Sequence, residues 1–284
     1  TNLGHALHEI GKFDEAIVNF TRVLEINPQS SHAHIHIGYT LKSQGKFDKA
    51  LESYKRALAI NPKLATAQHM IDSLLNKTTK APPREYVETL FDGYANKFDV
   101  SLVKKLQYQT PKELVNLVLV ELAGKKPIKV LDIGCGTGLI GPEIKPHCKE
   151  LVGVDLSQKM LEKARLKNTY DRLEHADISN FLSTEKLIYD LFISTDVFIY
   201  LGDLSKTFEV IKKRNQGQAL FAFSTEHFEG EGFRLERSGR YSHSKDYIFK
   251  LCDKYGYKLK NFSLHKLRKE KDEFLLGGYY ILET

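Results

Sequence analysis

The sequence predicts an α/β protein with a doubly wound, mostly parallel sheet, preceded by an all-α helical repeat domain. Three observations support this fold class. The first 75 of the 284 residues repeat with a fixed period, short apolar runs alternate with amphipathic stretches in the remainder, and a glycine-rich loop follows the first of these runs in Val130–Gly138. Alternating strands and helices are typical of parallel sheets, and a chain of this length usually forms two domains.

The N-terminal repeat covers residues 1–75. A shift of 34 residues aligns Gly11–Asp14 with Gly45–Asp48, and Ile26–Pro28 with Ile60–Pro62. Each unit predicts two short amphipathic helices that are joined by a turn and ended by Asn-Pro. The pattern resembles the tetratricopeptide repeat, with a capping helix over residues 65–75. Residues 76–83, which end in two prolines, are a predicted linker.

The resemblance implies a concave face that holds a peptide or a partner protein, and a stabilising or dimerising appendage is the alternative. The first repeat lacks the opening residues of the family's unit, so we expect the true N-terminus or a preceding repeat to be missing. His32 and His36 lie one helical turn apart, with His34 between them, but no carboxylate or cysteine joins them at a useful spacing. We expect no metal and assign all three to the helix surface.

The second domain is predicted for residues 84–284. Apolar residues from Tyr86 to Phe98 have helical spacing, so residues 84–124 predict N-terminal helices that either pack on the sheet or form a lid at 91–99. We expect strands at 128–133, 151–155, 190–195 and 219–224, and helices from 142 and over 157–167, 204–214 and 244–255. Residues 258–267 and 275–282 predict an antiparallel pair at the sheet edge, joined by a charged connection.

The glycine-rich loop allows two interpretations. Gly136–Gly141 matches the Gly-x-Gly-x-x-Gly pattern of dinucleotide-binding loops. That match is out of register, because a fingerprint that begins where the strand ends, at Gly134, would place its third glycine at Leu139. The pattern that begins at Gly134 is instead Gly-x-Gly-x-Gly, with Asp132 inside the strand before it. Glycines at these alternate positions let the backbone approach a ligand closely.

This arrangement resembles motif I of the class I S-adenosylmethionine-dependent methyltransferases. The resemblance covers residues 84–284 and implies a Rossmann-like sheet of seven strands. It places Asp155, at the end of the second strand, on the ribose hydroxyls, although an NAD site would use the same acid, and it places Asp177 near the adenine amino group. The residues that the resemblance assigns to the cofactor are Asp132, Gly134, Cys135, Gly136, Gly138, Asp155, Leu156, Met160, Asp177, Ile178, Thr195 and Tyr94.

The acceptor is expected over the carboxyl ends of the strands. Ser224–His227 follows the fifth predicted strand, and Ser238–His243 precedes a helix. Histidine can take a proton from an oxygen or nitrogen nucleophile, and arginine can hold an anionic acceptor. The resulting candidates are His243 and His227 for catalysis and Arg240, Tyr241 and Glu226 for the substrate. No Asn-Pro-Pro-Tyr motif follows the fourth strand, which disfavours methylation of DNA bases or amide nitrogens.

Composition narrows the setting of the protein. The formal charge of +6 and the pI near 8.9 are only mildly basic, so they do not specify a nucleic acid partner, and we consider one unlikely. The three cysteines form no Cys-x-x-Cys pair, which favours a reducing compartment. No apolar run approaches the roughly 20 residues of a membrane helix. The sequence therefore predicts a soluble, cytoplasmic protein.

Together these features predict a methyltransferase that uses S-adenosylmethionine, releases S-adenosylhomocysteine and has an unidentified small-molecule or protein acceptor. The repeats are expected to select or tether a partner protein. The combination resembles a group of bacterial predicted methyltransferases that carry tetratricopeptide repeats. Two alternatives remain at this stage: a repeat scaffold that binds S-adenosylmethionine without turnover, and an NAD-linked oxidoreductase.

Overall fold

A computed structural model describes residues 2–122, 124, 128–270 and 273–284. The chain divides into two compact units. The repeat unit comprises the residues through Thr79 together with Leu235–Gly239, and the sheet unit comprises Lys80–Arg234 and Arg240–Thr284. The break between Thr79 and Lys80 falls inside the stretch predicted as a linker. Residues 271 and 272, in the charged connection predicted between the last two strands, lie outside the described residues.

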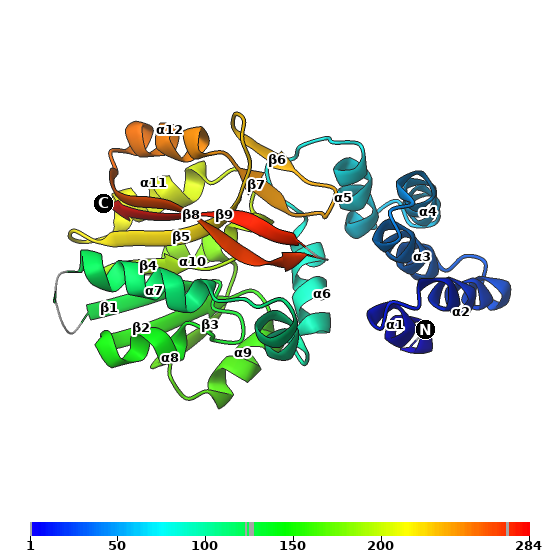
Figure 1. The fold of residues 1–284 in the computed structure, drawn as a ribbon, viewed down its shortest axis with the longest axis horizontal. Coiled ribbons are helices and arrows are strands. Elements are labelled where there is room, and N and C mark those ends of the chain that lie inside the picture. The colour runs from blue at the N-terminus through cyan, green and yellow to red at the C-terminus, as the bar shows by residue number, and fades with distance from the viewer. Residues whose placement is uncertain (1, 123, 125–127, 271–272) are drawn as a thin grey trace. The chain divides into compact units, whose positions relative to one another are not determined.

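The repeat unit is built from paired helices, as the 34-residue period predicts (Figure 1). The helices are α1 (Asn2–Glu9), α2 (Phe13–Ile26), α3 (Ser31–Ser43), α4 (Phe47–Ile60) and α5 (Ala65–Leu74). Glycine is required at equivalent places in the two repeats, because a Cβ on Gly4 would lie 2.6 Å from the ring of Phe20 and one on Gly38 would lie 2.5 Å from the ring of Tyr54. Each glycine therefore lets the aromatic side chain of the paired helix lie directly against the backbone.

One histidine that the sequence assigns to the helix surface lies in an aromatic cluster. The ring centre of His36 is 4.2 Å from that of His5 and 5.2 Å from that of Phe20. Burial among these rings lowers the pKa of His36 to about 4, so the imidazole is neutral at pH 7. His36 and His34 are half-buried, whereas His32 is exposed, so the assignment to the helix surface holds fully only for His32.

The sheet unit contains a sheet of nine strands within the described residues (Figure 1). Along one path its order is β3-β2-β1-β4-β5-β7-β6, and β9 also pairs with β5 and with β8. The strands are β1 (Ile128–Ile133), β2 (Cys148–Asp155), β3 (Arg172–His175), β4 (Leu191–Ser194), β5 (Leu220–His227), β6 (Phe233–Leu235), β7 (Tyr241–His243), β8 (Lys258–Glu270) and β9 (Glu273–Glu283). Each pair of neighbouring strands among β1 to β5 is parallel, and β9 runs antiparallel to β5 and β8.

The sheet has two strands more than the seven that the resemblance implies. They are the three-residue strands β6 and β7, and β7 pairs in parallel with the end of β5 through Glu226–Ser242 and His227–His243. Strands this short carry too few residues for a period-2 pattern. The stretch Ser238–His243, predicted as a loop before a helix, therefore contains a buried strand.

Helices cover both faces of the sheet. They are α6 (Arg84–Tyr94), the π-helix η1 (Val100–Lys105), α7 (Thr110–Glu121), α8 (Gly141–Ile144), η2 (Lys145–His147), α9 (Gln158–Leu166), α10 (Ile178–Thr184), η3 (Phe198–Tyr200), α11 (Ser205–Arg214) and α12 (Lys245–Tyr255). Alternate residues of each strand face opposite ways: Leu131 packs in one core with α10, α11 and α12, while its neighbour Val130 packs in a second core with α7 and α8. Both faces are buried, as expected of a parallel sheet.

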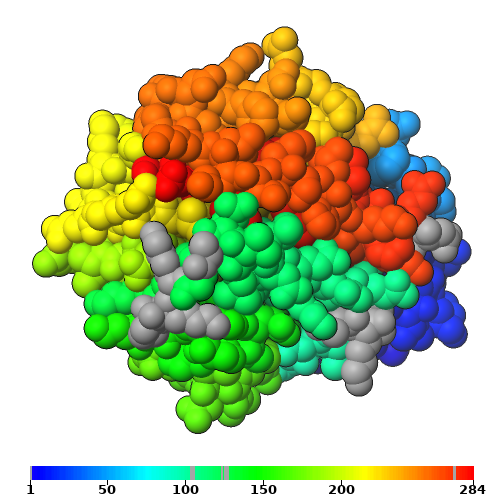
Figure 2. Space-filling model, turned by 60° about the vertical axis from the view of Figure 1, so that its left-hand side comes forward, coloured from blue at the N-terminus to red at the C-terminus, as the bar shows by residue number. Residues whose placement is uncertain are grey.

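The C-terminal hairpin closes one side of the sheet unit. Figure 2 shows this face, where the orange and red residues of the hairpin lie beside the green segment that includes α7. The contact is polar as well as apolar, since the hydroxyl of Tyr279 on β9 lies 2.9 Å from Oγ1 of Thr110 and 3.0 Å from a carboxylate oxygen of Glu113. No helix among the described residues has both the length and the apolar character needed to span a bilayer.

The close packing at Gly38 yields a stability prediction. Gly38→Ala should destabilise the repeat unit by about 1–3 kcal/mol, the usual cost of an overpacked core, because the new methyl group would collide with Tyr54. Urea unfolding of the full chain, followed by circular dichroism, measures this loss. The matched control is Gly93→Ala in α6, where no atom lies within 4 Å of the added carbon. An unchanged midpoint for Gly38→Ala would contradict the proposed contact.

Candidate functional site

A cavity of about 250 Å³ opens where β1, β2 and β4 end, entirely within the sheet unit. Ligands of doubly wound sheets bind at this edge because the loops after parallel strands meet there. Eight residues that the sequence assigns to the cofactor line the cavity, namely Gly134, Cys135, Gly136, Asp155, Leu156, Asp177, Ile178 and Thr195. The structure thus brings together residues from four separate loops.

The glycine-rich loop forms a tight turn at the end of β1. Carbonyl O of Val154 accepts hydrogen bonds from the amides of Gly134, at 2.8 Å, and Cys135, at 3.0 Å. Gly134 has φ +71°, and a Cβ there would lie 2.5 Å from Val197, so only glycine fits. Gly136 also has a positive φ, of +53°, but a Cβ there would meet no protein atom within 4 Å. The backbone at Gly136 is therefore exposed to the cavity for a ligand to approach.

Asp155 fixes this loop from the end of β2. One oxygen of its carboxylate accepts the amide of Gly136 at 2.8 Å, and the other accepts the amide of Ser157 at 2.8 Å. Burial raises the pKa of Asp155, and the two amides oppose that rise by stabilising the charged form. Each carboxylate oxygen can accept a further hydrogen bond, so Asp155 can hold a hydroxyl group of a ligand in the cavity.

Asp132 lies behind the loop and does not line the cavity. It is almost fully buried in β1, and its carboxylate accepts a hydrogen bond of 2.6 Å from the hydroxyl of Tyr170. Burial raises the pKa of Asp132 to about 7. Its observed contact is with Tyr170, on the chain after α9, so in this structure Asp132 supports the loop from within the sheet.

Three other residues assigned to the cofactor also lie behind the cavity lining. Gly138 faces Tyr170, since a Cβ there would lie 2.9 Å from that ring, and Met160 is completely buried in α9. Tyr94 donates its hydroxyl hydrogen bond to Ser101, and its ring packs edge-on against Phe98 at 5.6 Å. These three residues do not line the cavity, and they support the residues that do.

The structure also explains the out-of-register glycine pattern. A Cβ on Gly141 would lie 2.1 Å from the hydroxyl of Thr169, and both Gly138 and Gly141 lie against the ring of Tyr170. These glycines are therefore required by packing on the 169–170 segment. Leu139, which occupies the place of a third fingerprint glycine, lines the cavity.

Residues 91–99, predicted either to pack on the sheet or to form a lid, contribute two side chains to the cavity lining and are bonded to the loops around it. Phe91 and Phe98 line the cavity. Ser157 donates its hydroxyl hydrogen bond to Asp92 at 2.5 Å, and Lys167 lies 2.7 Å from the carboxylate of Asp99. Asp99 also accepts a hydrogen bond from the hydroxyl of Thr137, which belongs to the glycine-rich loop. Asp92 and Asp99 thus hold residues 91–99 against the loops that follow β2 and β1.

Six further residues line the cavity, namely Leu102, Tyr108, Asp196, Val197, Tyr200 and Leu201. The sequence places Asp196 and Val197, directly after the fourth strand, at the edge of the pocket, and it gives no signal for the other four. Asp196 follows β4 with φ +55°, a strained conformation for a residue other than glycine. Its amide donates to Ser224 at 2.9 Å, and its carboxylate pairs with Arg268 of β8. Burial raises the pKa of Asp196, and the charge of Arg268 opposes the rise.

The five acceptor-site candidates do not line the cavity. Glu226 and Arg240 pair with each other at 2.6 Å in a buried ion network. Tyr241 and His243 lie in β7 and are fully buried, and His227 lies 3.1 Å from Glu229 at the end of β5. The sequence places His243, a catalytic candidate, just before a helix, and the structure places it in β7, which pairs with β5 away from the cavity lining. Nε2 of His243 lies 2.9 Å from the carbonyl of Gly202, and burial lowers the pKa of the ring to about 4.

Comparison with known protein families supports the assignment of both units. The family described as "Methyltransferase domain" matches residues 130–214, which include the glycine loop, Asp155 and Asp177. The family described as "Tetratricopeptide repeat" matches residues 1–30 and 32–64. The two matches fall on separate units of the structure.

A curated relative with a similar sequence is the malonyl-[acyl-carrier protein] O-methyltransferase of Priestia megaterium. It is 30% identical over 169 residues, which are 57% of this chain and 58% of the relative. The chain thus spans little more than half the length of this relative.

Two solved structures resemble the sheet unit in fold. Magnesium protoporphyrin IX methyltransferase from Synechocystis PCC 6803, with bound S-adenosylhomocysteine, has a TM-score of 0.53 and 16% identity over 70% of this chain and 97% of its own. The 1,6-didemethyltoxoflavin-N1-methyltransferase of Burkholderia thailandensis has a TM-score of 0.55 and 14% identity over 73% and 93%. The sheet unit thus shares the fold of these two methyltransferases, residues 130–214 match a methyltransferase domain family, and residues 1–30 and 32–64 match the tetratricopeptide repeat.

Proposed function

We propose that this protein transfers the methyl group of S-adenosylmethionine to an oxygen or nitrogen atom of an acceptor bound beneath the aromatic lid. The observation that carries the proposal is the glycine loop. It exposes the backbone of Gly136 to a cavity while Asp155 fixes the amide of the same residue at 2.8 Å. This pairing offers a close backbone approach and a carboxylate side by side, which suits an amino acid joined to a ribose.

The proposed orientation of the cofactor follows from the order of groups along the cavity. Asp155 would accept hydrogen bonds from the ribose hydroxyls, and Asp177 with Ile178 would hold the adenine. The turn at Gly134–Gly136 would hold the methionine portion. Bound S-adenosylmethionine supplies an electrophilic methyl group on its sulfonium. The carboxylates nearby also suit its positive charge.

The protein's contribution to the transfer is proposed to be positioning. Phe91 and Phe98 from the lid line the cavity, so they would exclude water and confine the acceptor to one approach. Holding two reactants in line can supply a large part of the barrier reduction, of the order of 7–11 kcal/mol in favourable cases. The acceptor's heteroatom would gain the methyl group and lose any proton it carries.

The acceptor is proposed to occupy the wall formed by Tyr108, Tyr200 and Asp196. Two phenol rings and the apolar side chains beside them favour an acceptor with an apolar or aromatic body. The carboxylate of Asp196 is already paired with Arg268, so this wall carries no uncompensated positive charge for a polyanion. A small molecule or a group carried on a protein fits these features better than a nucleic acid, and the malonyl-carrying acceptor named for the P. megaterium relative has the second form.

The repeat unit is proposed to contribute to protein interaction, since tetratricopeptide repeats match this part of the chain. The alternatives from the sequence have less support. An NAD-linked oxidoreductase rested on the out-of-register glycine pattern, and packing against Thr169 and Tyr170 accounts for two of its glycines, Gly138 and Gly141. A scaffold that binds the cofactor without turnover remains the alternative that the experiment below must separate from the enzyme.

Calorimetric titration tests the choice of cofactor. We expect S-adenosylmethionine and S-adenosylhomocysteine to bind and NAD to give no heat. Incubation of cell extract with radiolabelled S-adenosylmethionine should then label an acceptor only when the protein is present. The absence of heat with both sulfur compounds would refute the cofactor assignment, and binding without any labelled product would favour the scaffold.

Substitution at Gly136 should remove cofactor binding without loss of the fold. Gly136→Val should weaken S-adenosylhomocysteine binding at least about tenfold, or 1.4 kcal/mol, because its side chain would fill space that no protein atom occupies. Calorimetry measures this change. Gly232→Val is the matched control, since Gly232 also has a positive φ, of +71°, and open space around it but lies outside the residues that line the cavity. Equal losses of affinity in the two variants would argue against a ligand at Gly136.

The role of Asp155 yields a second affinity prediction. Asp155→Ala should weaken S-adenosylhomocysteine binding at least about tenfold, the scale of one lost charge-assisted hydrogen bond. It removes both the proposed ribose acceptor and the partner of the Gly136 amide. Asp155→Asn keeps one acceptor oxygen and should lose less affinity. If Asp155→Ala binds as tightly as the wild type, the ribose assignment is wrong.

A further inference from the structure

The repeat unit contains a short segment that is distant from the repeats in the sequence. Leu235–Gly239 groups with the helical repeats, although the residues before and after it belong to the sheet unit. This docked segment, with the sequence Leu-Glu-Arg-Ser-Gly, connects β6 to β7. Leu235 and Gly239 at its ends are buried, whereas Arg237 in the middle is exposed.

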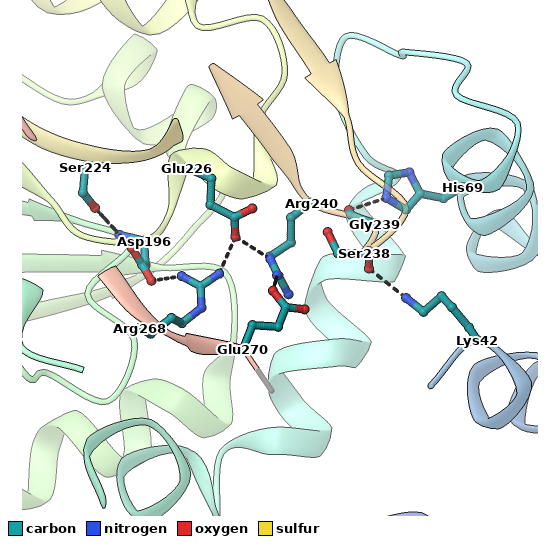
Figure 3. Close-up of polar contacts among 10 residues, drawn as sticks. All are labelled: Lys42, His69, Asp196, Ser224, Glu226, Ser238, Gly239, Arg240, Arg268 and Glu270. Carbon is teal, nitrogen blue, oxygen red and sulfur yellow. Dashed lines mark hydrogen bonds and ion pairs between the residues drawn. The ribbon is translucent and has the colours of Figure 1, made fainter. Parts of the chain in front are cut away.

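The repeats hold the docked segment mainly through its backbone. Nζ of Lys42, on α3, donates a hydrogen bond of 2.9 Å to the carbonyl of Ser238. Nε2 of His69, on α5, lies 2.9 Å from the carbonyl of Gly239 (Figure 3). The side chain of His69 is only 2% exposed, so the segment provides a polar partner that a buried imidazole needs.

Two further contacts complete the binding of the segment. The hydroxyl oxygen of Thr78 accepts a hydrogen bond of 3.2 Å from the amide of Leu235. The guanidinium of Arg237 lies 4.9 Å from the ring centre of Phe47, at the start of α4. Contacts therefore come from α3, α4, α5 and the chain that follows them. The repeat unit thus contacts two backbone carbonyls and one side chain of the segment.

The next residue after the docked segment is Arg240, which belongs to the sheet unit. Arg240 pairs with Glu226 and with Glu270, each at 2.6 Å. The same oxygen of Glu226 also binds Arg268, and Arg268 binds Asp196 (Figure 3). This ion network of two arginines and three carboxylates runs from the peptide bond at Gly239 to Asp196, a residue that lines the cavity.

We propose that the repeat unit binds the docked segment as an internal ligand, and that this binding holds Arg240 in the ion network that positions Asp196 in the cavity wall. The tetratricopeptide repeats then act in the first instance on their own chain. Release of the segment would free the backbone at Gly239 and loosen Arg240. The ion pairs of Arg240 with Glu226 and Glu270 would weaken, and Arg268 and Asp196 would become more mobile.

Hydrogen–deuterium exchange in the full chain tests both parts of the proposal. The test variant combines Lys42→Met with Arg237→Ala, which removes the side-chain donor to the carbonyl of Ser238 and the contact with Phe47 and leaves His69 in place. We expect exchange of the amides in residues 235–239 to accelerate at least about tenfold. We also expect the amide of Asp196, which is bonded to Ser224, to exchange at least about threefold faster.

Two comparison variants make the result specific. Arg234→Ala removes a stacking contact of the same kind, since the guanidinium of Arg234 lies 4.3 Å from the ring centre of Phe228, but both residues belong to the sheet unit. It should leave exchange at 235–239 and at Asp196 unchanged. Arg240→Met breaks the ion network directly and should accelerate exchange at Asp196 at least as strongly as the test variant.

The outcomes separate the two parts. Unchanged exchange at 235–239 in the test variant would overturn the internal ligand. Faster exchange at 235–239 with no change at Asp196, in a protein where Arg240→Met does alter Asp196, would overturn the link to the cavity. No cofactor or acceptor takes part in the measurement, so a failure of the proposed methyl transfer would not affect its interpretation.

Discussion

The turn at the end of β1 is the constraint on which the sheet unit depends. The chain must leave the sheet at Gly134 and still bring two amides onto the carbonyl of Val154. Only a residue without a side chain can do this against Val197, and only a positive φ can turn the backbone toward Asp155. The same turn leaves Gly136 lining the cavity, where an added Cβ would meet no protein atom within 4 Å. Packing and ligand access therefore have one cause.

Much of this site could be predicted from the sequence because its signals are local. The spacing in the sequence from Asp132 to Gly138 fixes the register of the loop. The strand before Asp155 places that acid at the edge of the sheet. The register argument excluded the dinucleotide pattern, but it did not separate the glycines that face the cavity from those that face protein. Gly138 and Gly141 match a dinucleotide pattern, yet their space is taken by Tyr170 and Thr169. Local spacing can identify a glycine that is needed, but only the fold shows what it approaches.

The remaining features depend on contacts between distant residues. Strands β6 and β7 have three residues each and are fixed by pairing with the end of β5, which no local pattern reveals. His243 was therefore predicted in a loop and lies in a buried strand. Arg268 falls in the charged connection predicted after residue 267, yet it lies in β8, is only 6% exposed and pairs with two carboxylates. The nearby φ of +55° at Asp196 gives no sequence signal at all.

A gain in folding stability does not explain the buried ion network around Arg268. Removing buried charges from water costs several kcal/mol per ion, and a well-packed apolar replacement is often at least as stable. Strained backbone at Asp196 adds a further cost of about 1–3 kcal/mol. Desolvation and backbone strain both act at Asp196, in the cavity wall. We infer that the position of its carboxylate matters more than the stability that is lost in holding it there. The members of the network lie in β5, in β8, just after β4 and just before β7, so they can hold that position only while all four segments stay in place. Arg240 is the member that directly follows the docked segment, and so it is the point at which the repeats can influence the cavity.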